Sequence, residues 1–185
     1  WMRNLFPAKS ESAVTRDELA AMVEVAEDES VIETDEEKAI RNLLSLRDQN
    51  VTTVMTPRTV MSFVLVDDTV QAAMDKNPIM VHGRLPVFDG EIDQPVGLVL
   101  RSDIYRKAAA DEHQSKMSSL MRDIVRVGEK TNLDDLLDIF LSRKEQLALV
   151  QDEFGATLGL VTMEDVIETI LGVEIVDEKD IEGIE

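Results

Sequence analysis

The chain of 185 residues is long enough for one or two domains with a hydrophobic core. Its 19 basic and 38 acidic residues give a net charge of −19 at pH 7, which repels phosphate backbones and anionic membrane surfaces, so we expect no nucleic-acid partner. The chain has no cysteine, which excludes disulfides and thiolate metal sites. It contains no run of about 18 apolar residues, so no segment of this sequence is expected to span a membrane.

Residues 1–50 predict a loose lead-in followed by an acidic linker of two helices. Thr15 and Glu18 have the spacing of a capping box, and apolar residues then recur at helical spacing. Thr34 and Glu37 have the same spacing and predict a capping box at the start of a second helix. Helices as short as these are marginal in isolation, so each is expected to need a partner surface.

From residue 51 onward the sequence repeats itself at one constant spacing. The corresponding segments are 85–89 with 147–151, 97–99 with 159–161, and Asp103 with Asp165. Three matches at one spacing are hard to obtain by chance. The sequence therefore predicts two copies of one unit, residues 51–112 and residues 113–174, followed by an acidic tail at 175–185.

Each copy has the same predicted order of elements. A short apolar strand (63–66, 124–127) precedes an amphipathic helix (70–76, 133–143), two strands follow (84–89 and 95–100, 146–151 and 157–162), and a helix ends the copy (102–110, 163–171). Gly172 is placed to cap the last helix. This β-α-β-β-α order indicates an α+β fold. Because one unit is too small for a good core, we expect the two to pack face to face.

Three motifs carry a resemblance to a known family: VMTPR at residues 54–58, GRLPV at 83–87 and GLVTMED at 159–165. With them the chain resembles a tandem CBS-domain pair, or Bateman module, preceded by a short helical linker. More narrowly, it is similar to the cytosolic part of the CorC/HlyC hemolysin-like proteins and their animal relatives, the cyclin M metal-transport mediators. The likeness covers about residues 15–180.

The resemblance implies a regulatory module that binds an adenine nucleotide, ATP or AMP, with or without Mg²⁺. It further implies a homodimer on the cytoplasmic face of the inner membrane, joined to a membrane domain N-terminal to residue 1 that moves divalent cations such as magnesium or cobalt. The alternative is a structural dimerisation module with a vestigial nucleotide site. We expect no enzyme, because the sequence has no nucleophile–base pair and no metal-ligand spacing.

Thr162 and Asp165 form the best candidate site that the residues themselves suggest. The motif predicts a strand that turns sharply into a helix, where free backbone N–H groups and the Thr162 hydroxyl attract phosphate. The Asp165 carboxylate can accept hydrogen bonds from the two hydroxyls of a ribose. The same two residues also fit an ordinary capping box. Both roles are compatible if capping uses the threonine oxygen and leaves the aspartate free.

The remaining contacts are implied by the resemblance. It places adenine between the repeats, against Thr56-Pro57 and His82-Gly83-Arg84-Leu85-Pro86, with Arg84 facing the phosphates. The alternative for Arg84 is a solvated arginine at the end of a strand.

The first copy departs from this pattern at one position. It has Leu100 at the position that corresponds to Thr162, and leucine offers no donor to phosphate. We therefore expect a weak or empty second site at Asp103. Asp103 is equally well explained as a carboxylate stabilised by the dipole at a helix start.

Overall fold

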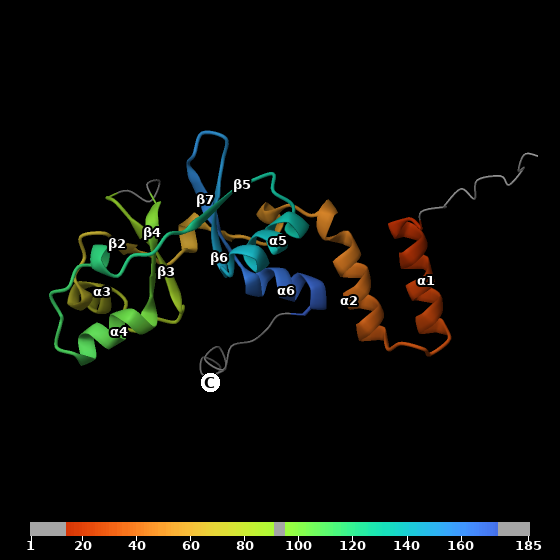
Figure 1. Cartoon of the computed structure of the whole chain (residues 1–185), viewed down its shortest axis with the longest axis horizontal. Coiled ribbons are helices and arrows are strands. Elements are labelled where there is room, and N and C mark those ends of the chain that lie inside the picture. The colour runs from red at the N-terminus through yellow and green to blue at the C-terminus, as the bar shows by residue number, and fades with distance from the viewer. Residues whose placement is uncertain (1–13, 91–94, 174–185) are drawn as a thin grey trace, which may run out of the picture.

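The structure is a computed structural model that describes residues 14–90 and 95–173. The lead-in up to residue 13 and the predicted acidic tail at 175–185 lie outside the described residues. The molecule is elongated, with a helical hairpin at one end and the two repeats beside it (Figure 1). None of the helices in the described ranges is both long enough and apolar enough to cross a membrane.

The helical hairpin consists of α1 (Arg16–Asp28) and α2 (Thr34–Ser45). Thr15 caps α1 with the predicted box: its hydroxyl accepts from the Glu18 N–H (3.2 Å) and Glu18 accepts from the Thr15 N–H (2.8 Å). The prediction for the start of α2 was wrong by one position. Thr34 is the first helical residue, the N-cap is Glu33, and the Thr34 hydroxyl donates to Glu27 of α1 instead (2.8 Å). Neither helix buries a residue.

Both repeats follow the predicted β-α-β-β-α order. The elements of the first are β2 (Val64–Leu65), α3 (Val70–Lys76), β3 (Arg84–Phe88), β4 (Pro95–Leu100) and α4 (Arg101–Ala109). Those of the second are β5 (Val125–Gly128), α5 (Leu133–Arg143), β6 (Leu147–Gln151), β7 (Thr157–Thr162) and α6 (Met163–Leu171). In each sheet the first strand runs parallel to the second, and the second and third form an antiparallel hairpin. Gly172 caps α6 in the left-handed conformation (φ 66°), as predicted.

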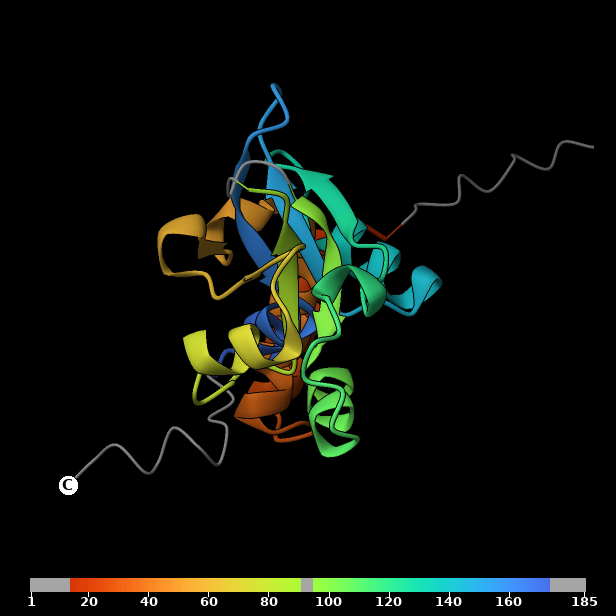
Figure 2. The same ribbon diagram turned by 90° about the vertical axis from the view of Figure 1, so that its left-hand side faces the viewer.

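Three apolar clusters hold the sheets and helices together. Figures 1 and 2 show the arrangement of these sheets and helices. One cluster lies under α3 and α4 on the first sheet, and a second lies under α5 and α6 on the second sheet. The third combines side chains of both sheets, including Phe88 and Leu98 from the first with Leu147 and Leu149 from the second. The two sheets therefore face each other with the helices outside, which confirms the predicted face-to-face packing.

The segment that leads into each repeat packs on the other repeat. Leu46 and Val51 precede β2, the first strand of the first repeat, but are fully buried in the core under α5 and α6. The short strand β1 (Thr56–Pro57) extends the second sheet by pairing antiparallel with β7. In the same way Met117, which leads into the second repeat, is fully buried in the core under α3 and α4. The two repeats are thus joined by an exchange of their leading segments, which was not predicted from the sequence.

The constant spacing found in the sequence holds for only part of the repeat. Residues of β4 and α4 are separated by this spacing from their counterparts in β7 and α6. The helix caps Thr69 and Asn132 are also counterparts, but they are separated by one position more. Leu85 therefore corresponds to Ala148, not to Leu147 as the sequence alignment implied, and both lie on the helix side of their sheets. The cause is loop length, because the loop 89–94 between β3 and β4 is one position longer than the loop 152–156 between β6 and β7.

Candidate functional site

The junction of β7 and α6 forms the predicted turn from strand to helix. Asp165 is the third residue of α6, and its Oδ2 accepts hydrogen bonds from the Thr162 N–H (2.6 Å) and hydroxyl (2.8 Å). The Thr162 hydroxyl in turn accepts from the Asp165 N–H (3.3 Å). The capping-box interpretation is confirmed. The expectation that capping leaves the aspartate free was wrong, because Oδ2 is engaged twice; Oδ1 takes no part in these bonds.

The carboxyl group of Asp165 is partly buried, and burial raises its pKa above the ordinary value. The two hydrogen bonds from Thr162 oppose this shift, and the nearby charge of Glu168 adds to it. The net rise means that the carboxylate is less well solvated in the protein than in water. Additional hydrogen-bond donors, such as the hydroxyls of a sugar, would stabilise its charged form.

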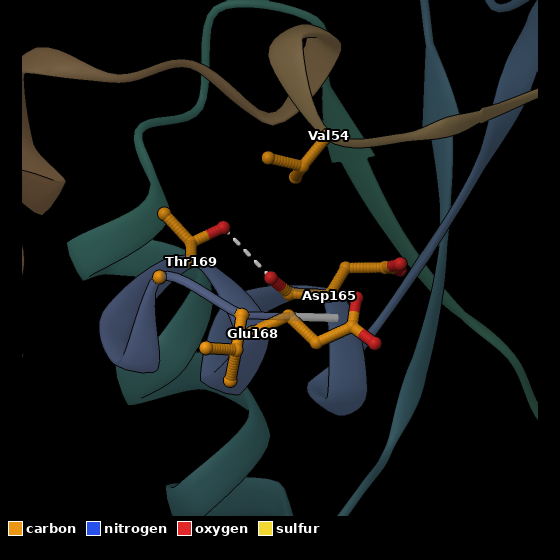
Figure 3. A pocket seen from close by; sticks show the side chains of 6 residues that line it. Val54, Asp165, Glu168 and Thr169 are labelled. Atoms are coloured by element: carbon orange, nitrogen blue, oxygen red, sulfur yellow. Dashed lines mark hydrogen bonds between the residues drawn. The ribbon is translucent and has the colours of Figure 1, made fainter. Parts of the chain in front are cut away.

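A hollow of about 360 Å³ opens beside Asp165. Its lining residues come from one face of α6, from the end of that helix and from the segment before β1: Val54, Asp165, Glu168, Thr169, Gly172 and Val173. Figure 3 shows Val54 across the hollow from the three labelled side chains of α6. The Thr169 hydroxyl donates to the Asp165 carbonyl (2.7 Å). The volume is within the range of pockets that hold small molecules.

Asp165 is the one residue of this lining that was predicted from the sequence as a site residue. Glu168, Thr169 and Gly172 follow it at positions i+3, i+4 and i+7, which is the spacing of one helix face. That periodicity was available from the sequence. The contribution of Val54 was not, because it depends on the packing of the segment before β1 on the second repeat.

The predicted residues Thr56 and Pro57 lie beside the strand that leads to Thr162. They form β1 and pair with Leu160 and Gly159 of β7. A Cβ atom at Gly159 would overlap the carbonyl oxygen of Thr56. The glycine of this motif is therefore required for β1 to approach β7, and this close approach holds Thr56 opposite Leu160, two residues before Thr162.

The segment His82-Gly83-Arg84-Leu85-Pro86 lies on the first repeat. His82 and Gly83 are exposed, and the strand β3 begins at Arg84. Leu85 points into the core under α3 and α4. His82 and Leu85 line a separate, smaller hollow of about 50 Å³, which shares no lining residue with the hollow at Asp165. The structure thus pairs Thr56-Pro57 with the strand that leads to Thr162. Arg84 instead pairs with Leu100, and the Gly83 carbonyl accepts from the Arg101 N–H (3.0 Å), so this segment lies at the start of α4 in the first repeat.

Asp103, the counterpart of Asp165, is 7% exposed and has two cationic partners. Its Oδ1 accepts from Nη1 of Arg106 and its Oδ2 from Nη2 of Arg122, both at 2.7 Å. Leu100 occupies the N-cap of α4 and makes no side-chain hydrogen bond. Neither arginine was predicted from the sequence to contact Asp103. Both carboxylate oxygens of Asp103 are therefore engaged within the chain.

Metal ligands were not predicted for this chain. Across residues 14–90 and 95–173, no group of three His, Asp or Glu side chains is arranged to hold a metal ion.

Fold and site together define a tandem CBS-domain pair. The family model described as "CBS domain" matches residues 117–172. The solved structure described as the CBS domain of the bacterial CNNM/CorC family Mg²⁺ transporter is 32% identical, with a TM-score of 0.83 over 89% of this chain and 99% of that chain. The chain belongs to this family of CBS domains, that of the CNNM/CorC proteins.

Two further comparisons bear on the function. The "Magnesium and cobalt efflux protein CorC" of Pasteurella multocida is 31% identical over 169 residues, which is 91% of this chain. The chain spans 56% of the length of that relative. A structure of the CNNM/CorC-family CBS domain in complex with ATP is 33% identical, with a TM-score of 0.72 over 76% of this chain and 99% of that chain.

Proposed function

We propose that the chain binds an adenine nucleotide, ATP or AMP, at Asp165 and thereby regulates divalent-cation transport by a membrane protein of which it is part. The observation that carries the proposal is the hollow of about 360 Å³ beside a partly buried carboxylate at a helix N-terminus. The complex of a similar CBS domain with ATP supports the choice of ligand.

The geometry suggests how the nucleotide lies along α6. The ribose hydroxyls donate to Asp165, and the hollow that continues along the helix to Gly172 and Val173 takes the base. This placement differs from the one that the resemblance implies, because no residue of Thr56-Pro57 or of the segment 82–86 lines this hollow. The phosphates then extend toward the helix N-terminus, where the backbone N–H groups provide a local positive potential. Such a local potential is needed because the chain as a whole carries a charge of −19. Mg²⁺ accompanies ATP through the phosphate oxygens.

The partners in this proposal are a second copy of the chain and the membrane domain of the longer protein. We place the module on the cytoplasmic face of the inner membrane. The CorC relative, named for magnesium and cobalt efflux, supports divalent cations as the transported ions. In this role the module is not an enzyme, and a nucleotide controls it only by binding one arrangement of the repeats better than another.

Calorimetric titration with ATP, ADP and AMP, each with and without Mg²⁺, tests the proposal. We expect D165A to weaken binding of the preferred nucleotide by about 1–3 kcal/mol, roughly five- to 150-fold, because a partly buried acceptor is removed. E164A is the matched control, since Glu164 is exposed and adjacent on α6. Folded wild-type protein that binds none of the nucleotides would refute the function, and unchanged affinity in D165A would refute the ribose contact.

One observation favours the alternative of a structural dimerisation module with a vestigial site. Thr162 donates two hydrogen bonds to Oδ2 of Asp165, so the chain itself supplies this oxygen with donors. The two functions differ in a simple measurement: the vestigial module forms a stable dimer whose melting temperature does not change when ATP or AMP is added.

A further inference from the structure

The two repeats are related by an approximate two-fold arrangement that pairs Thr56 with Arg122. Thr56 lies opposite Leu160 of β7, and Arg122 lies opposite Leu98 of β4. Leu98 and Leu160 are themselves counterparts, since they are the central residues of the repeated Gly-Leu-Val motif. The backbone contact is equivalent as well, because a Cβ at Gly97 would overlap the carbonyl oxygen of Arg122 as one at Gly159 would overlap that of Thr56.

A second pair of residues supports this correspondence. Val51 and Met117 have the same separation in the chain as Thr56 and Arg122, and each begins a short 3₁₀ turn that is buried in the other repeat. The leading segments therefore correspond residue by residue. Thr56, which lies opposite Leu160 two residues before Thr162, is therefore replaced on the other side of the module by Arg122, which contacts Asp103.

The arginine changes what the first position can bind. Its guanidinium donates to Oδ2 of Asp103, Arg106 donates to Oδ1, and the Asp103 side chain is only 9% exposed. Charge-assisted hydrogen bonds of this kind are roughly twice as strong as neutral ones. A ribose hydroxyl, which is a neutral donor, would have to displace them, and Leu100 offers a phosphate nothing in exchange.

We propose that Arg122 closes the first nucleotide position, the one at Asp103. Its guanidinium pairs with the Asp103 carboxylate and takes the place that a ligand would have. This inference rests on the proposed function, since it explains why one of two equivalent positions is open. The Arg122–Asp103 pair also links the segment that leads into the second repeat to α4 of the first. A nucleotide in the hollow contacts Val54 and Asp165 and so makes the corresponding link on the other side of the module. There the Asp165 carboxylate accepts from the neutral Thr162 instead of a cation.

The test is the number of ATP molecules bound per chain, measured by calorimetry in the wild type and in the variant L100T/R122T. This variant restores at the first position the residue types of the second. We expect one ATP per chain in the wild type and two in the variant. R143T removes an exposed arginine on α5 and is the charge-matched control, for which we expect one. L100T/R122Q, which keeps a longer polar side chain, serves if L100T/R122T does not fold.

Each outcome decides between the inference and the function on which it rests. A folded variant that still binds one ATP overturns the role of Arg122, and so does a wild type that binds two. If the wild type binds none and the variant binds one, the proposed site at Asp165 fails while the closure by Arg122 is supported. If neither binds ATP, both are wrong.

Discussion

At the scale of single residues, the glycines of the repeated Gly-Leu-Val motif have a steric role. Gly159 and Gly97 each lie under a carbonyl oxygen of the segment that leads into the other repeat. A side chain at either position would push that segment away from the sheet. The glycine of the motif is therefore needed for the packing of each leading segment on the opposite repeat, and not only for the candidate site.

Substitution of Gly159 by alanine tests this role. We expect G159A to lower the free energy of unfolding by about 1–3 kcal/mol, because the new Cβ overlaps the backbone of Thr56 and forces β1 to move. G83A is the control, since a Cβ at Gly83 meets no atom within 4 Å, and it should change stability by less than about 0.5 kcal/mol. Equal effects of the two variants in urea unfolding would contradict the steric explanation.

The raised pKa of Asp165 predicts a pH dependence of stability. Because the folded protein holds this proton more tightly than the unfolded chain, the stability that Asp165 contributes is fully present below the ordinary pKa of 3.8 and is lost as the pH rises through the folded-state value. The variant D165N stays uncharged and lacks this loss. Urea unfolding should therefore show wild type becoming less stable relative to D165N as the pH rises from below 3.8 to neutrality. A constant difference over that range would show that burial does not raise this pKa.

At the scale of elements, α6 connects the candidate site to the helical linker. Asp165 lies in its first turn, while its last carbonyls accept from α2: Lys38 Nζ donates to the Gly172 carbonyl (3.0 Å) and Asn42 Nδ2 to that of Ile170 (3.1 Å). A ligand in the hollow touches both ends of this helix, since the hollow runs from Asp165 to Val173. A movement of α6 on binding would therefore reach α2 directly.

The double variant K38A/N42A should uncouple α2 from the site. On the proposed function, we expect ATP to change the amide hydrogen exchange of α2 in the wild type. We expect K38A/N42A to bind ATP equally well but to lack this change, because both hydrogen bonds to the end of α6 are gone. K130A removes an exposed lysine elsewhere and should keep that change. An ATP-dependent change in α2 that survives in K38A/N42A would mean that the signal travels by another route.

At the scale of the whole molecule, the exchange of leading segments makes the two repeats one folding unit. The core of the second repeat contains Leu46 and Val51, and that of the first contains Met117. Each fully buried apolar side chain contributes about 1.5–3 kcal/mol. Their loss is a large fraction of the roughly 5–15 kcal/mol that stabilises a typical domain.

Two fragments test this unit. We expect residues 110–173, the second repeat without Leu46, Val51 and β1, to show no cooperative unfolding in urea. The fragment 46–173 keeps both repeats and both leading segments. It omits the helical hairpin, which buries no residue, and the two ends of the chain, so it should unfold cooperatively. A stable, cooperatively folded 110–173 would show that the exchange is not needed for the fold.

Most of the element order could be predicted from the sequence, because it depends on local patterns. The helices at Val70–Lys76, Leu133–Arg143 and Met163–Leu171 and the cap at Gly172 all follow from apolar periodicity and cap residues that are close together in the chain. A single repeat spacing could not account for the whole repeat, because loops of different length shift the register between its parts.

The chain's own sequence thus determined the repeated α+β unit, the Thr162–Asp165 capping box and the family resemblance. Only the tertiary structure decided which residues surround the two aspartates. Arg122 lies on a different segment from Asp103, and Val54 is separated from Asp165 by most of both repeats, so no local pattern relates such positions. The packing of each leading segment on the opposite repeat brings them together. That packing places a cation beside Asp103 and a hollow beside Asp165.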